Sequence, residues 1–152
     1  MSADKKLTEL GITLPAPTAP RANFVTSVQT GNLLYLAGHG PIRDGSVPVE
    51  GQLGAELNAD EGYRVARSVG INLLATARAA LESLDRVVRV VKVLGMVNSA
   101  PKFTEQPKVI NGFSDPMVEV FGDAGRHACS AVGMAQLPNG VPVEIEMTLE
   151  VR

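Results

Sequence analysis

The chain has 152 residues and a formal net charge of −2 at pH 7, with 45% hydrophobic and 20% charged residues. This length suits one domain with a hydrophobic core, and the composition is typical of a soluble globular protein. The charge gives no general reason to bind nucleic acid or an anionic membrane. Only 4% of the residues are aromatic and none is tryptophan, which leaves few platforms on which bases could stack.

The cysteine content and the N-terminal residues favour a cytoplasmic protein. One cysteine cannot form an internal disulfide, so nothing indicates an oxidising compartment. The residues that follow Met1 carry charges without the apolar run of a secretory signal. No segment approaches about 18 uncharged apolar residues, so we expect no membrane span.

The N-terminal part predicts an extended leader over residues 1–22 and a single domain over residues 23–152. Residues 11–22 contain three prolines, which favour extended chain. Two strands are then expected at Phe24–Gln29 and Leu33–Ala37, because Thr30-Gly31-Asn32 between them is typical of a hairpin turn.

Gly38-His39-Gly40-Pro41 breaks the second of these strands, and residues 42–57 predict a loop with a short strand. The strongest helix signal follows at residues 59–84. Asn58 can cap this helix, and Glu61 completes a capping box. Its apolar residues recur at three- and four-residue steps, which predicts one stripe packed on a sheet: Ala66, Val69, Leu73, Ala77, Ala80, Leu81 and Leu84.

The β-branched run Val87–Val97 predicts a strand that is buried on both faces for much of its length. A second helix is expected over residues 107–121, where Pro116 should kink it or restart it. Residues 127–136 and 142–151 predict a final pair of strands joined as a hairpin. The order is that of an α+β fold, with a mixed sheet and two main helices packed on one face.

The candidate chemistry gathers in the first of those final strands. Because alternate residues of a strand share a face, His127 and Cys129 should lie on one side and Arg126 and Ser130 on the other. The last strand alternates apolar residues with Glu144, Thr148 and two further glutamates, as a half-buried strand does.

Four segments together resemble the YjgF or Rid (reactive intermediate deaminase) family: Gly31–Gly38, Val109-Ile110-Asn111, Ser130–Pro138 and Val143–Glu146. The resemblance spans Pro20 to Arg152. It implies a chorismate-mutase-like α+β fold, assembled as a homotrimer with small-molecule sites in the clefts between subunits. Its well-characterised members hydrolyse reactive imines and enamines to keto acids and ammonia.

The resemblance also assigns site residues, with one departure. Glu144 matches the carboxylate thought to hold the attacking water, and Asn111 matches a polar cleft residue. Phe24 stands where deaminases have a tyrosine. The arginine that grips the substrate carboxylate is replaced by Cys129, counted back from Leu137-Pro138.

An arginine fork can make two charge-assisted hydrogen bonds to a carboxylate, each contributing about 1.5–3 kcal/mol. A neutral thiol donates weakly and cannot replace it. Arg126 is three residues away, so on a regular strand it points to the other face unless a bulge rotates it. The replacement of this arginine by Cys129 therefore disfavours ordinary imine deaminase activity.

Three interpretations of Cys129 stay open: a small buried hydrophobe, a catalytic thiolate, or a residue that lines a pocket without reacting. A thiolate needs an electropositive neighbour, and His127 lies about 6.6 Å along the strand. His39 could approach from another strand. Both histidines are expected to be structural or to lie at the site rim. No metal site or cofactor is expected, because no third ligand has suitable spacing.

We thus predict Cys129 and Glu144 as candidate catalytic residues, and five ligand-binding candidates: Phe24, His39, Asn111, Arg126 and His127. The favoured function is binding of a keto acid, imine, enamine or related metabolite in an intersubunit cleft. The alternative is a divergent hydrolase or deaminase that uses Cys129 or a water held by Glu144. Ribonuclease activity is disfavoured by the acidic balance and the few aromatic residues.

Overall fold

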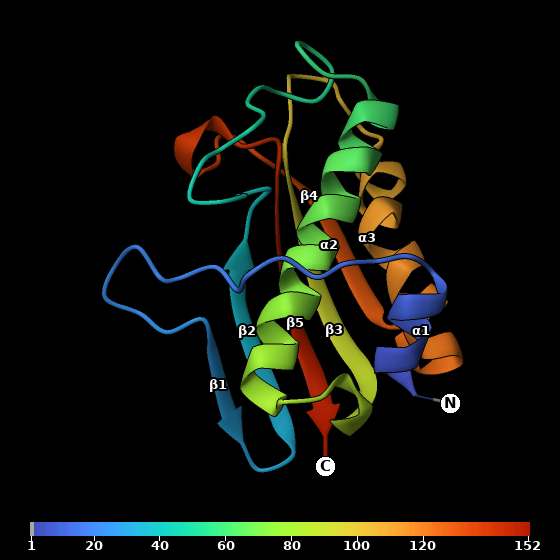
Figure 1. Ribbon diagram of the computed structural model, residues 1–152. Helices are drawn as coiled ribbons and strands as arrows, with labels where there is room; N and C mark the ends of the chain where they lie inside the picture. Colours follow the sequence, from blue (N-terminus) through green and yellow to red (C-terminus); the bar gives the residue numbers. More distant parts are fainter. Residues whose placement is uncertain (1) are drawn as a thin grey trace.

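A mixed sheet of five strands, covered by helices on one face, forms the fold in a computed structural model that describes residues 2–152 (Figure 1). The strand order is β1-β2-β5-β3-β4. The predicted α+β class is confirmed. The strands are β1 Ser27–Thr30, β2 Leu33–His39, β3 Val87–Asn98, β4 Ala128–Met134 and β5 Val143–Val151. The helices are α1 Ala3–Glu9, α2 Ala59–Leu81 and α3 Gln106–Phe121, with short 3-10 turns at Leu84–Arg86, Gly122–Gly125 and Pro138–Gly140.

Helix α2 begins at the predicted capping box. The Asn58 side chain accepts a hydrogen bond from the Glu61 amide at 2.9 Å, and the Glu61 carboxylate accepts one from the Asn58 amide at 2.7 Å. The helix ends at Leu81, three residues before the predicted end, because Glu82 turns into the left-handed region with φ of +67°. The predicted apolar stripe is buried up to this point, apart from the exposed Ala80.

Helix α3 runs without interruption through Pro116, so the expected restart there is wrong. It packs closely on α2, since a Cβ at Gly112 would overlap the backbone carbonyl of Tyr63. On the outer surface the two helices are joined by a salt bridge from Arg67 to Glu119 at 2.8 Å. The pair forms one layer over the sheet (Figure 1).

The predicted final hairpin is wrong. Strands β4 and β5 do not pair with each other; each pairs with β3, which lies between them. β4 is parallel to β3 and β5 is antiparallel. The reason is the crossover through α3, which returns the chain to the same end of the sheet and makes the next strand parallel.

The expected burial of β3 on both faces is also wrong for the single chain. On the helix-covered face Val90, Val93 and Val97 are fully buried. On the opposite face, Lys92 is exposed and Leu94 is only half-buried. We call this uncovered side of the sheet the open face.

The extended leader is wrong for residues 3–9, which form helix α1. Two aspartates, one in helix α1 and one in the Leu84–Arg86 turn, hold the helix against that turn by hydrogen bonds. Asp85 accepts hydrogen bonds from the Ser2 hydroxyl at 2.8 Å and the Ala3 amide at 2.6 Å, and Asp4 accepts one from the Ser83 hydroxyl at 2.6 Å. Ala3 and Leu7 join the main cluster of buried apolar residues, although the start of the domain at residue 23 stays a prediction.

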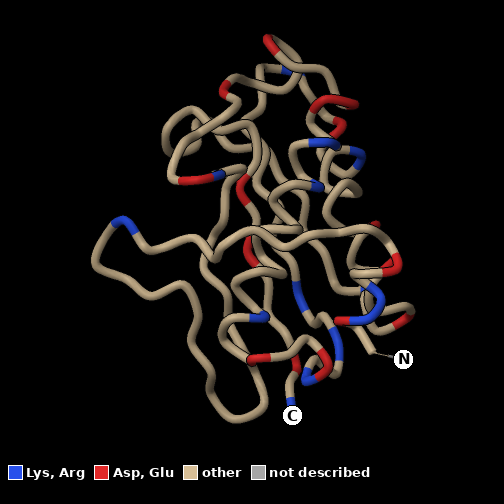
Figure 2. The backbone as a smooth tube through the Cα atoms, viewed as in Figure 1, with Lys and Arg blue, Asp and Glu red and all other residues tan. Residues whose placement is uncertain are grey.

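Residues 12–24 follow α1 as a strap without helix or strand that crosses in front of α2 and leads to β1 (Figure 1). Ile12 and Leu14 pack against the core. The hairpin of β1 and β2 then forms one side of the molecule. Figure 2 shows it without any charged residue, as the sequence from 22 to 42 requires.

Candidate functional site

A cavity of about 370 Å³ lies where the strap, the end of β2, the Pro138–Gly140 turn and β5 meet. Phe24 and Glu144 line it, together with the Gly38-His39-Gly40 turn. The glycine at 38 makes room for the glutamate: a Cβ there would lie 2.5 Å from the Glu144 Oε1 atom. The cavity thus contains one carboxylic acid, Glu144. Its position is possible only because Gly38, on the neighbouring strand, has no side chain.

Glu144 is half-buried on the open face of β5. Burial raises the pKa of its carboxyl above the ordinary value, and the like charge of Glu146 raises this pKa further. The carboxyl therefore keeps its proton to a higher pH than a solvated glutamate does. Such a group is suited to hold a water molecule and to exchange a proton with it.

His39 lines the cavity but uses both ring nitrogens inside the protein. Its Nδ1 donates to the Ala37 carbonyl at 2.6 Å, and its Nε2 accepts from the Thr76 hydroxyl at 2.8 Å. Burial lowers the pKa of the ring, which favours this neutral form. Asn72 donates to the carbonyls of Gly40 and Ile42 at 3.1 and 2.9 Å. Together these bonds fix the turn that forms the cavity wall against α2.

The remaining predicted site residues lie in a second group beside α3. His127 donates from Nδ1 to the Gly125 carbonyl at 2.7 Å, and its Nε2 lies 3.1 Å from the Ser114 hydroxyl. Burial lowers the pKa of this ring as well. Asn111 is exposed on α3, and Arg126 is exposed and pairs with Asp123 at 3.4 Å.

Cys129 and Glu144 lie on opposite faces of the sheet. Cys129 is level with Val93, whose side chain is buried under the helices, so Cys129 projects to the helix side of the edge strand β4. Glu144 of β5 pairs with Met96 of β3, and Met96 in turn pairs with Val132 of β4. Strand spacing and rise put the Cα atoms of Cys129 and Glu144 about 14 Å apart. A single chain therefore cannot bring both to one small molecule.

Cys129 is exposed in the single chain, so the interpretation as a buried hydrophobe is wrong at this level of assembly. Partial burial raises the pKa of its thiol, and the charge of Lys92 only partly opposes this. The surroundings thus favour the thiol over the thiolate, which disfavours a nucleophilic role at neutral pH.

Alkylation of Cys129 by iodoacetamide should be slow at about pH 7 and should still accelerate above about pH 9, because only the thiolate reacts and its pKa lies above the ordinary cysteine value. The mass increase of the intact protein reports this single site directly. A rate that reaches its plateau below about pH 8 would instead show a stabilised thiolate.

Within residues 2–152, no cluster of three or more His, Cys, Asp or Glu side chains could hold a metal ion. Across the same residues, none of the helices is both long and apolar enough to span a membrane.

A family model described as "YjgF/chorismate_mutase-like, putative endoribonuclease" matches residues 4–140. The chain belongs to this family. Protein TCP17 of Trypanosoma cruzi is 48% identical to it over 145 residues, which are 95% of this chain and 91% of that protein. This YjgF-family chain also resembles solved structures over nearly its whole length.

One of these structures is the protein Atu1372 of unknown function from Agrobacterium tumefaciens, with 41% identity and a TM-score of 0.91 over 99% of this chain and 92% of that one. Another, from Shewanella oneidensis MR-1, is described as "a putative endoribonuclease". It has 28% identity and a TM-score of 0.95 over 99% of this chain and 100% of that one. These matches cover 99% of this chain, so α1 and the strap are part of an architecture that other proteins share.

Sequence reasoning missed two features of this site. The contact between Gly38 and Glu144 depends on strand pairing, which no local motif reveals. Arg21 lines the same cavity from the strap, where the proline content was the only signal.

Proposed function

We propose that this YjgF-family protein binds a small metabolite, a keto acid, imine, enamine or related compound, in a cleft between copies of a homotrimer. The observation that carries this proposal is that Glu144 and Cys129 lie on opposite faces of one sheet. The cavity with Glu144 and the β4 edge with Cys129 are each half of a site. A second copy would supply the half that each chain lacks.

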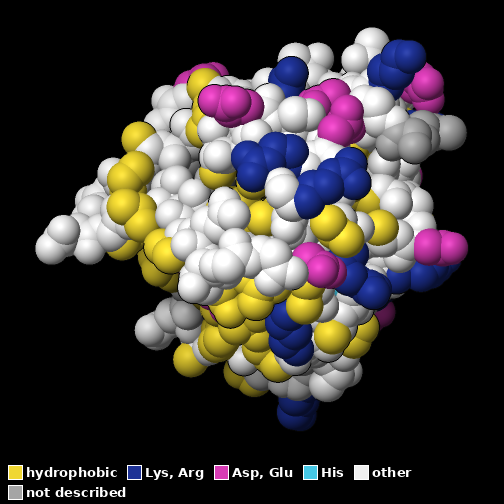
Figure 3. Space-filling model, turned by 90° about the horizontal axis from the view of Figure 1, so that it is seen from below, with side chains coloured by type: hydrophobic (Ala, Val, Ile, Leu, Met, Phe, Trp, Pro, Cys, Tyr) yellow, Lys and Arg dark blue, Asp and Glu magenta, His cyan; other side chains and the backbone are white. Residues whose placement is uncertain are grey.

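The open face supports an assembly of several copies. It carries exposed apolar side chains around β1 and β2, with exposed fractions of 61% for Val25, 54% for Val28 and 45% for Tyr35. Figure 3, seen from below, shows hydrophobic side chains gathered along the side where β1 lies. Contiguous exposed apolar surface of this kind is typical of a protein interface.

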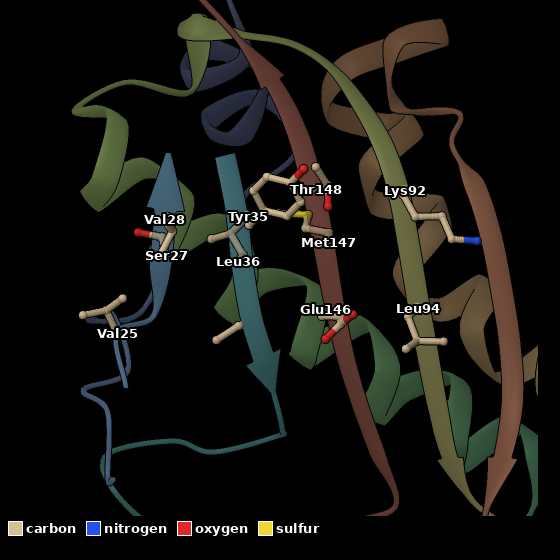
Figure 4. Close-up of a pocket in the computed structure, with 11 residues that line it drawn as sticks. Val25, Ser27, Val28, Tyr35, Leu36, Lys92, Leu94, Glu146, Met147 and Thr148 are labelled. Atoms are coloured by element: carbon tan, nitrogen blue, oxygen red, sulfur yellow. The ribbon is translucent and has the colours of Figure 1, made fainter. Parts of the chain in front are cut away.

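Figure 4 shows the same face at closer range, with the helices behind the sheet. A shallow cavity of about 270 Å³ lies among Tyr35, Thr148, Glu146 and Lys92. Lys92 donates to the Ser130 hydroxyl at 2.9 Å, toward the β4 edge. An apolar surface with a few polar groups of this kind suits a contact with another copy of the chain.

The protein should bind such a metabolite without hydrolysing it at ordinary deaminase rates. Cys129 stands at the position of the arginine that grips the substrate carboxylate in deaminases, and its neutral thiol cannot supply that fork. The second candidate is a divergent hydrolase in which Glu144 holds the attacking water. The raised pKa of this carboxyl favours that alternative over any mechanism through a Cys129 thiolate.

Calorimetric titration with 2-oxobutanoate tests the proposal. We expect saturable binding with one ligand per chain, and we expect Gly38→Val to abolish it, because the added side chain would fill the cavity beside Glu144. Ala80→Val, on the exposed side of α2, is the matched control and should bind like the wild type. Absence of binding by the wild type would contradict the proposal.

Turnover is tested in parallel by ammonia release from an imine generated in the assay. Cys129→Arg should raise this rate at least about 10-fold, since one arginine bond of 1.5–3 kcal/mol already corresponds to that factor. Cys129→Lys, which adds charge without the planar fork, should raise it less. Wild-type hydrolysis as fast as that of Cys129→Arg would show that the hydrolase alternative is correct.

A further inference from the structure

One arginine, Arg21, is among the residues that line the cavity beside Glu144. Among the residues that line it, only Arg21 and Glu144 carry a charged side chain. Burial lowers the pKa of His39, which favours its neutral form, although the hydrogen bond to the Ala37 carbonyl acts in the opposite direction. The rest of the lining is uncharged and mostly apolar, as with Phe24, Ile42 and Val141. The charge that a ligand meets on this surface is therefore set by two side chains.

Arg21 has unused hydrogen-bonding capacity. The side chain is exposed, and its guanidinium donates to the backbone carbonyl of Gly45, which lines an adjoining cavity. Across residues 2–152 no carboxylate lies within 4.0 Å of this guanidinium. Arg67 and Arg78, by contrast, each pair with an acid, at 2.8 and 3.1 Å. A guanidinium presents five N–H donors in a fixed fork, so most of the donors of Arg21 remain for another acceptor.

The segment that carries Arg21 is anchored on its N-terminal side, and the side chain is restrained as well. The strap is anchored by helix α1 and by Ile12 and Leu14, which pack against the core. The Arg21 guanidinium is restrained by its own hydrogen bond to the Gly45 carbonyl. Prolines along the strap further restrict its conformations. A cation fixed in this way loses little freedom when a ligand binds.

We propose that Arg21 is the residue of this cavity that binds the carboxylate group of the proposed ligand. This assignment rests on the proposed function and deepens it. Arg21 comes from the same chain as Glu144, whereas position 129 would belong to the neighbouring copy. The strap thus supplies the positive charge that Cys129 cannot.

Titration with 2-oxobutanoate and with its uncharged methyl ester tests this assignment in the full-length protein. Arg21→Gln should weaken binding of the acid by at least about 10-fold, the usual scale for a charge-assisted hydrogen bond, and should leave binding of the ester unchanged. Arg21→Lys should lose less affinity for the acid. Arg43→Gln removes an exposed arginine of the adjacent loop that does not line the cavity, and it should bind both compounds like the wild type.

The two compounds separate the possible failures. Equal weakening of acid and ester by Arg21→Gln would show that the residue only shapes the cavity, and unchanged acid binding would show that it plays no part; either result overturns the assignment alone. A wild-type protein that binds neither compound would overturn the proposed function together with it. Loss restricted to the acid supports Arg21 as its anchor.

Discussion

Gly112→Ala is expected to lower the free energy of unfolding by about 3 kcal/mol or more, the largest stability effect that we foresee for a single methyl group. The glycine lies at the contact of α3 with α2, where an added Cβ would overlap the backbone carbonyl of Tyr63. Backbone cannot move aside as a flexible side chain can. The helices would have to separate, and the salt bridge between Arg67 and Glu119 would be strained with them.

Gly70→Ala provides the matched control, because it adds the same methyl group to a buried helical glycine of the facing helix. Its Cβ would lie 3.2 Å from the Phe113 ring, which can yield slightly. The gain in helix propensity of about 1 kcal/mol offsets that contact. Urea unfolding at one fixed protein concentration compares both variants with the wild type, since assembly makes stability depend on concentration. Equal effects of the two changes would refute the close helix packing.

Tyr35→Glu is expected to convert the proposed trimer to single chains of 16.0 kDa and to abolish binding of 2-oxobutanoate. Tyr35 stands on the open face, level with Val28 and Thr148. A glutamate there would be buried on assembly beside Glu146, which lines the same shallow cavity. Burying an unpaired charge next to a like charge costs several kcal/mol, and a trimer would meet this cost at each of its interfaces.

Light scattering coupled to gel filtration measures the mass, and circular dichroism checks that the fold is retained. Gln29→Glu is the control, because Gln29 pairs with the buried Leu34 and so projects from the other side of the same hairpin. It should keep about three times the mass of one chain. A Tyr35→Glu protein that remains assembled would show that the open face is not the interface.

Much of the fold could be predicted from local patterns. The capping box at Asn58 and Glu61 fixed the start of α2, and the apolar periodicity placed both main helices within a few residues. The failures concern contacts between distant segments. Nothing in residues 127–151 reveals that β3 lies between the last two strands, and the burial of α1 depends on Asp85, far along the chain.

In the candidate site, too, local patterns were predictable and contacts between distant segments were not. Alternation along the strand correctly placed His127 and Cys129 on one face, which the buried partners Phe113 and Val93 confirm. It could not show that Glu144 lies on the other face, because that relation requires the register of three strands. The roles assigned to these residues stay predictions. Arg21 has no periodic or motif context, and only the path of the strap brings it to the cavity.

The central claim is that the Glu144 cavity of one copy adjoins Cys129 of the next. Its most direct test is the rate of Cys129 alkylation with and without 2-oxobutanoate at a concentration that calorimetry shows to be saturating. Within one chain, Glu144 and Cys129 lie about 14 Å apart on opposite faces of the sheet. A ligand bound beside Glu144 therefore cannot shield the thiol of the same chain. We expect saturating ligand to slow alkylation several-fold in the wild-type protein, because the proposed assembly places the ligand beside Cys129 of the next copy. An unchanged rate at saturation would contradict it.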